Sequence, residues 1–284
     1  MAACAVPAGA RSLAAITKWA ADVPPKLLLR PGGGLRDPDT GPAAPRGATV
    51  RRVLQRVDGD ALDAAIGAWL TDRAPAEQPR PAVAVDGKTV RGAVRADGTQ
   101  VQLLAAMNTA GLVPAQREAE AKGSEIRVFQ PLLAPLDPAG TVVTFDAPHT
   151  RHIHAGFLAE EKNAHFIAPI KGNHPTSHHT PKRLPWHDVP LQQHTRATAH
   201  GRDEIRRVKT CTVIRGIDFP HASQAIQIVR RRRTVTTGQI SIERVYAVTS
   251  LTVRQAEPAE TAQHVREHWG NREQDPPRQG HDPR

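Results

Sequence analysis

The stretch AVAVDGKTV, residues 82 to 90, constrains the fold of this chain more than any other segment. Its first four residues, Ala82 to Val85, are small or β-branched and predict a buried strand. The strand leads directly into Asp86, and a carboxylate at the end of an apolar strand is costly unless another group pairs with it or coordinates it. The fold therefore has to bring a partner to Asp86 from elsewhere in the chain.

A second apolar strand ends in the same way, because GTVVTFD at 140 to 146 runs into Asp146. Three strands, a helix, a strand, a helix and a strand follow one another in this region, which is the order of a ribonuclease H-like α/β layer. The sequence thus predicts an α/β fold, with a ribonuclease H-like mixed sheet flanked by helices. The other predicted elements are strands at 101–108, 112–121 and 165–171 and helices at 125–133 and around 157–158.

This order places the two strands side by side and brings Asp86 close to Asp146, although 60 positions separate them. Two facing carboxylates repel each other and retain a proton unless a cation lies between them. Hard oxygen ligands suit Mg²⁺ or Mn²⁺, and a pair of such ions can bind the attacking and leaving oxygens of a phosphodiester displacement. The competing interpretation is that Asp86 belongs to a turn and Asp146 caps a helix. The two residues alone do not decide between these readings.

Composition narrows the class of protein. A chain of 284 residues with 39% hydrophobic content can bury a core. Its net charge of +10 and pI near 10.4 favour a polyanionic partner, with nucleic acid as the leading candidate. The two cysteines, Cys4 and Cys211, are too few for a disulfide scaffold, which fits a reducing cytoplasm. No segment approaches the ~20 apolar residues of a membrane-spanning helix, so no membrane partner is expected.

The N-terminal part predicts helices. A proline-rich stretch at 73–82 reads as a linker, so we expect a helical region at 1–75 and a separate domain at 76–270. Asp60 is the expected cap of the second helix. Two helices joined at 58–59 either read DNA as a helix-turn-helix or form a packing unit, which is the commoner case. The apolar residues at helical spacing are Val50, Val53, Leu54 and Val57, then Leu62, Ala65, Ile66, Trp69 and Leu70.

Seven blocks occur in order along nearly the whole chain: VAVDGKTVRGA at 83–93, LLAAMN at 103–108, EI..FQPLL at 125–133, TVVTFDAPHT at 141–150, KNAHFIAPIKGN at 162–173, HGRDEIR at 200–206 and VREHWG at 265–270. Together these blocks resemble the ISAs-type insertion-sequence transposases. The resemblance implies a ribonuclease H-like core that cuts and rejoins double-stranded DNA at transposon ends and targets, through an Asp, Asp, Glu triad that binds Mg²⁺ or Mn²⁺. Asp86 matches the first carboxylate and Asp146 the second.

The same resemblance suggests where DNA is held and where the protein acts. A bacterial transposase is expected in the cytoplasm on the nucleoid, and the oligomeric state stays open, with a homodimer as one option.

Lys171 and Asn173 follow a strand and suit a phosphate, although a plain turn is the simpler account. A structural charge ladder competes with DNA contact for Arg202, Glu204 and Arg206. The candidate DNA contacts are Lys88, Arg91, Lys171, Asn173, Arg202 and Arg206.

The third carboxylate departs from the family pattern. Relatives continue from HWG into a helix written Ile-Glu-Asn, whereas NREQDPPRQGHDPR follows here. Glu273 is the candidate, but it stands one position late, which on a helix turns a side chain by about 100°. Pro276 and Pro277 then end the helix, so 271–284 is expected to be an aberrant, disordered tail. Pro148, where relatives carry Leu, also removes a backbone donor near the site.

These departures predict a transposase by descent with weak activity or none, and a non-catalytic DNA-binding remnant is the alternative. A general ribonuclease H-like nuclease would share the aspartates but would not explain the other blocks. A single-base frameshift after Gly270 would account for the tail, because the shifted reading of suitable codons begins Ile-Glu-Asn. The coding DNA downstream of Gly270 tests this hypothesis, since an immediate stop in the next frame would refute it.

Two further clusters have alternative readings. Ten of the 14 histidines fall between 149 and 200. They raise the question of a zinc site, but without nearby cysteines solvated or DNA-facing histidines are favoured. The tract 230–233 consists of arginines and predicts a basic sheet edge. Such an edge either discourages aggregation or contacts phosphates.

Overall fold

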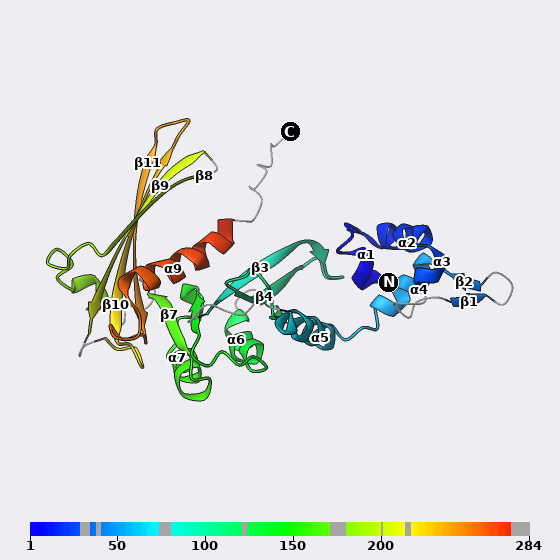
Figure 1. Ribbon diagram of the computed structural model, residues 1–284, viewed down its shortest axis with the longest axis horizontal. Coiled ribbons are helices and arrows are strands. Elements are labelled where there is room, and N and C mark those ends of the chain that lie inside the picture. Colours follow the sequence, from blue (N-terminus) through cyan, green and yellow to red (C-terminus); the bar gives the residue numbers. More distant parts are fainter. Residues whose placement is uncertain are drawn as a thin grey trace. The chain divides into compact units, whose positions relative to one another are not determined.

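A computed structural model gives the fold of the protein (Figure 1). The chain divides into two compact units, Met1–Leu62 and Asp63–Arg284, and each is considered by itself. Among the described residues, no helix combines the length and apolar character needed to span a membrane. The structure describes residues 1–28, 35–37, 41–73, 81–120, 124–170, 180–199, 201–213 and 217–273, without the side chains of 25, 26, 35–37, 41, 42, 91 and 269–273.

The first unit is a small, mainly helical region with its own core, and it ends at Leu62 rather than at the expected 75. Ser12 caps its second helix by accepting a hydrogen bond from the Ala15 N–H at 3.1 Å. The expected apolar face at 50–57 is only partly buried, because its helix ends at Leu54 and Val53 stays 54% exposed. The buried core residues are Ala5, Ala10, Ile16 and Val50. The elements are α1 (Ala2–Ala5), α2 (Leu13–Asp22), α3 (Pro25–Leu28), β1 (Leu35–Asp37), β2 (Gly41–Ala43) and α4 (Gly47–Leu54).

Helix α5 (Gly59–Asp72) is capped by a different residue from the one predicted. The Asp58 Oδ1 atom accepts a hydrogen bond from the Ala61 N–H at 3.1 Å, so Asp58 is the cap and Asp60 lies within the first turn. The predicted apolar face of α5 is largely exposed, and its buried residue is Gly67. A Cβ at Gly67 would lie 1.9 Å from the Pro114 carbonyl oxygen. This glycine therefore permits α5 to approach the β4–β5 connection closely.

We expect Gly67→Ala to lower the free energy of unfolding. Alanine normally stabilises a helix by about 1 kcal/mol relative to glycine. Here the added methyl group would overlap backbone that cannot move aside alone, and such overpacking costs about 1–3 kcal/mol. Gly156→Ala is the matched control, because the nearest atom to its added Cβ would be 3.9 Å away. Urea unfolding of both variants checks this, and a stabilised Gly67→Ala protein would contradict the close approach.

The second unit contains one nine-stranded sheet with the order β5-β4-β3-β6-β7-β11-β10-β9-β8. Strands β3, β4 and β5 form an antiparallel meander, and β6 and β7 run parallel to β3. The predicted ribonuclease H-like mixed sheet is confirmed. The strands are β3 (Ala82–Val94), β4 (Gln100–Asn108), β5 (Ala115–Ala119), β6 (Val142–Phe145), β7 (His165–Ile170), β8 (Gln193–Ala199), β9 (Arg202–Thr212), β10 (Gln224–Thr234) and β11 (Ile240–Thr249).

Helices cover both faces of the sheet. Alternation along β3 sends Val83 and Val85 into a core shared with Phe129 of α6, and sends Ala82 into a core shared with Val265 of α9. The two opposite faces thus carry different helices (Figure 1). The helical elements are α6 (Glu125–Leu133), η1 (Ala147–His149), α7 (His152–Gly156), η2 (Phe157–Glu161) and α9 (Pro258–Glu273).

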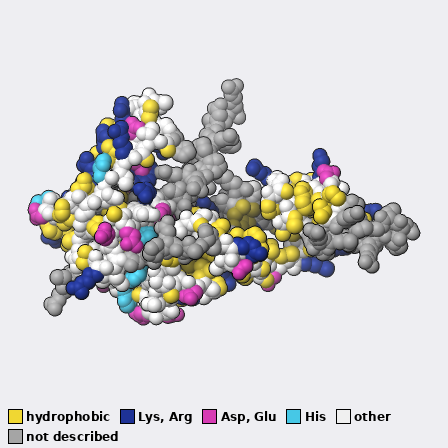
Figure 2. All heavy atoms as spheres, viewed as in Figure 1, with side chains coloured by type: hydrophobic (Ala, Val, Ile, Leu, Met, Phe, Trp, Pro, Cys, Tyr) yellow, Lys and Arg dark blue, Asp and Glu magenta, His cyan; other side chains and the backbone are white. Residues whose placement is uncertain are grey.

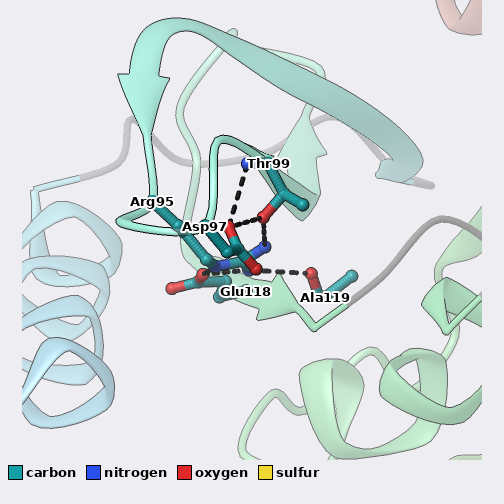
Figure 3. Close-up of polar contacts among 5 residues, drawn as sticks. All are labelled: Arg95, Asp97, Thr99, Glu118 and Ala119. Atoms are coloured by element: carbon teal, nitrogen blue, oxygen red, sulfur yellow. Dashed lines mark hydrogen bonds and ion pairs between the residues drawn. The ribbon is translucent and has the colours of Figure 1, made fainter.

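The β3–β4 hairpin shows how local chemistry extends β3 beyond the predicted strand end. A turn forms at 97–98, where Asp97 Oδ1 accepts hydrogen bonds from the Thr99 N–H at 2.9 Å and the Thr99 hydroxyl at 2.7 Å (Figure 3). These bonds, the hydroxyl's first, lower the pKa of Asp97. Arg95 Nε donates to Glu118 Oε1 at 3.1 Å and so ties the hairpin to β5. Strand β3 consequently runs on to Val94 rather than ending at Asp86.

Candidate active site

The sheet brings Asp86 and Asp146 together. Val85 and Phe145 are register partners on the parallel strands β3 and β6, and each aspartate is the next residue along its strand. Neighbouring strands lie about 4.8 Å apart, so the two aspartates occupy corresponding positions on one face of the sheet. Asp146 begins η1, and Pro148 lies in its first turn, where the missing N–H is tolerated. The expected loss of a needed backbone donor at Pro148 therefore does not arise.

His268 of α9 contacts Asp146 and lies close enough to Asp86 to be influenced by its charge. Its Nε2 atom lies 3.3 Å from Asp146 Oδ1, and its Nδ1 atom lies 3.1 Å from the Thr144 hydroxyl. The arrangement is satisfied when the hydroxyl donates to Nδ1 and the Nε2–H donates to the carboxylate. Burial lowers the pKa of His268, while the charge of Asp86 opposes that shift. Sequence reasoning missed this residue, although it lies within the VREHWG block.

A second group of polar residues lies across the sheet from the aspartates. A Cβ at Gly87 would be 2.9 Å from Glu125 Oε2, so the glycine makes room for a carboxylate from the first turn of α6. Glu125 Oε2 in turn lies 4.0 Å from His149 Nε2. Within the described residues, the buried His149 Nδ1 atom has no hydrogen-bond partner. Burial, and to a lesser extent the nearby His154, lowers the pKa of His149 to about 4.

This histidine predicts loss of stability in mild acid. Its pKa is about 6.5 in the unfolded chain and about 4 in the folded protein, so the unfolded state binds the extra proton between these values. The free energy of unfolding should therefore be greatest above pH 6.5 and fall by about 3 kcal/mol as the pH approaches 4. Urea unfolding between pH 4 and 7 measures this slope. In His149→Asn the slope should be flatter, and equal slopes in both proteins would refute the assignment.

Two of the clustered histidines are not solvated in the way predicted, whereas His152, His187 and His194 are exposed. His149 and His154 are buried and stack on Phe129, with ring centroids 5.2 and 4.2 Å away. Within the part of the chain that the structure describes, no group of three or more His, Cys, Asp or Glu side chains is arranged to hold a metal ion. The run at 174–179 lies outside the described residues.

The candidate DNA contacts lie on separate strands or outside the described residues. Lys88 is half-buried and, two residues beyond Asp86 on β3, shares its face of the sheet. Arg202 is exposed on β9. Arg91 lies in β3, but its side chain is outside the description, as is that of Glu273 at the end of α9. Lys171 and Asn173 lie outside the described residues altogether.

Arg206 is wrong as a DNA contact. Its side chain is only 9% exposed and forms an ion pair with Glu204, which also accepts hydrogen bonds from Arg230 at 2.5 Å and Arg232 at 2.7 Å. One half-buried carboxylate thus pairs with three guanidinium groups, which favours the alternative of a structural charge ladder. The tract 230–233 is also not a sheet edge, because β10 pairs with β11 on one side and β9 on the other.

Comparison with known proteins agrees with this geometry. A family model described as a transposase DDE domain matches residues 77–270, and a DDE_Tnp_1-associated model matches 1–70. An uncharacterized protein in the dhlA 3′ region of Xanthobacter autotrophicus is 29% identical over 72% of each chain. YncI of Escherichia coli O157:H7, provisionally named a transposase, is 28% identical over 56% of this chain and 42% of its own.

A solved piggyBac transposase synaptic complex with hairpin DNA is 9% identical, with a TM-score of 0.36 over 69% of this chain and 40% of that chain. That likeness is too low to support any argument. The family model, by contrast, covers more than half of the sequence, including Asp86, Asp146 and His268. The chain belongs to the transposase DDE domain family.

Proposed function

We propose that this chain is a DNA transposase that cleaves phosphodiester bonds at transposon ends and transfers the strands to target DNA, with a divalent metal held by Asp86 and Asp146. The observation that carries the proposal is the meeting of these two aspartates at corresponding positions of neighbouring parallel strands. They lie within the residues matched by the family model.

The donor set fits Mg²⁺ or Mn²⁺. Mg²⁺ is typically held by one or two carboxylates together with phosphate oxygens of the substrate and water, and two carboxylates on one sheet face meet that description. The Asp146 side chain is 20% exposed, which leaves room for further ligands. A bound divalent ion would stabilise the charge on the attacking and leaving oxygens of the phosphodiester.

The residues around the carboxylates have positioning roles in this proposal. His268 donates to Asp146 Oδ1 and keeps the other carboxylate oxygen available to a cation. Lys88 lies on the same face of β3 as Asp86 and supplies positive charge for a phosphate. Arg91, Lys171, Asn173 and Arg202 remain proposed DNA contacts of the same kind.

The register of α9 supports impaired catalysis. Position 272 is four residues beyond His268 and lies within about 40° of it around the helix, whereas position 273 is rotated by about 140°. Arg272 thus occupies the position closest to the face that meets the aspartates, and Glu273 is one position late. The same observation favours the second candidate, a DNA-binding transposase remnant without cleavage activity.

Binding of Mn²⁺ tests the proposed metal site without requiring turnover. We expect electron paramagnetic resonance to detect a bound Mn²⁺ ion that weakens by more than about tenfold in Asp146→Asn, because a charged oxygen ligand is removed. His268→Gln should weaken binding less, since it only removes the orienting hydrogen bond. Identical Mn²⁺ affinity in Asp146→Asn and the unaltered protein would exclude the site.

A further inference from the structure

The two faces of strands β8 to β11 differ in whether their arginines form ion pairs. On one face, half-buried Glu204 forms ion pairs with Arg206, Arg230 and Arg232. On the other, five exposed arginines lie on four neighbouring strands, and within the described residues none of them forms an ion pair. This second surface, the arginine face, consists of Arg196, Arg207, Arg231, Arg233 and Arg244.

The strand register fixes the arrangement of the arginine face. Arg207 and Arg244 are both partners of Val229, and Arg231 lies two residues further along the central strand β10. Register partners and alternate residues point to the same side of a sheet, so these guanidinium groups share one surface. Alternate residues are about 6.8 Å apart along a strand, which equals the rise of two nucleotides of one DNA strand along the helix axis.

Among the described residues, other elements cover only the inner part of this side of the sheet, and the arginine face is the part that they leave uncovered. Nearer the core, Trp186 packs on Ala225 and Tyr246 of the same strands, with the two ring centroids 6.2 Å apart. Beyond that contact, Ile240 and Ile242 are 49% and 67% exposed among the arginines. Figure 2 shows Lys and Arg side chains gathered over this outer end of the strands, at the upper left of the view.

We infer that the arginine face binds the phosphate backbone of duplex DNA, outside the aspartate site. Its charge is complementary to a polyanion, and the carboxylate that shares the face, Asp203, is opposed by Arg233 and accepts a hydrogen bond from Thr198 at 2.8 Å. A second copy of this chain is a poor occupant, because two such faces would repel each other. Contacts of this type position DNA and carry no sequence specificity. The inference rests on the proposed function, since it takes DNA as the polyanion.

The salt dependence of DNA binding tests the inference. Fluorescence anisotropy in EDTA, with a labelled duplex of about 30 base pairs and arbitrary sequence, excludes the metal site from the measurement. The test variant carries Arg207→Gln, Arg231→Gln and Arg244→Gln. The slope of log affinity against log salt is negative, and each lost phosphate contact reduces its magnitude by about 0.9. Loss of three contacts should therefore reduce the magnitude by about 2.7. Between 0.05 and 0.2 M salt, the unaltered protein should lose roughly 40-fold more affinity than the variant.

Matched charge removal elsewhere separates local contact from net charge. Arg127→Gln, Arg183→Gln and Arg254→Gln replace three exposed arginines outside the face, and this control should retain the full slope. Equal slopes in the test and control variants would overturn the inference. A change of oligomeric state on sedimentation, with an unchanged slope, would assign the face to a second copy and also overturn it. Asp86→Asn should keep the full slope, so failure of the metal chemistry is distinguishable from failure of this surface.

Discussion

Arg272→Glu is expected to raise metal-dependent nicking of transposon-end DNA by about 100-fold or more. The substitution places a carboxylate four residues beyond His268, on the side of α9 that reaches Asp146. Loss of an outer-shell group at a metal site typically costs 10–100-fold in activity, and a direct carboxylate ligand should matter more. The assay is Mn²⁺-dependent conversion of a supercoiled plasmid that carries the genomic DNA flanking the coding sequence.

Removal of a positive charge beside the site has to be separated from the gain of a ligand. Arg272→Gln makes the first change without the second and should leave nicking low. Glu273→Gln should change nicking little in either background, because position 273 faces away from His268. If Arg272→Gln nicks DNA as fast as Arg272→Glu, the register argument for the third carboxylate is wrong.

Asp86→Asn in the Arg272→Glu background should reduce nicking by more than about 100-fold, to the level without metal. The amide keeps the size of the side chain but removes the charge that would face a cation and His268. Asp86 is half-buried and does not belong to the apolar core, so the fold should be retained. Circular dichroism and the salt dependence of DNA binding establish that the variant is folded and retains DNA.

Asp188→Asn is the matched control for this loss. Asp188 is 69% exposed in a turn and pairs with His187, away from the two aspartates. It should leave nicking unchanged. Retained nicking in Asp86→Asn would show that the observed cleavage does not pass through the aspartate pair.

The strand order and the aspartate pair were predictable because each depends on a short, strong pattern. Apolar β-branched runs ending in Asp86 and Asp146 define two strands, and the order of elements around them places those strands in contact. The helix at Glu125–Leu133 was predicted over its observed range, since its apolar residues recur at helical spacing. These are local signals that the tertiary structure did not override.

The remaining features depend on contacts that sequence spacing does not reveal. Arg206 was misassigned because Glu204, which pairs with Arg230 and Arg232 of β10, also pairs with Arg206. Only the β9–β10 register brings these residues together. His268 and Asp146 meet across 122 positions, so no local pattern links them. Asp58 replaced Asp60 as the cap because helix boundaries are uncertain by a residue or two.

The contact between α9 and β6 can form only late in synthesis of the chain. Asp86 and Asp146 can pair as soon as β3 and β6 have left the ribosome, but His268 is synthesised 122 residues after Asp146. At about 5–20 residues per second, that interval lasts roughly 6 to 24 seconds. A nascent chain therefore lacks the contact between His268 and Asp146 throughout this interval.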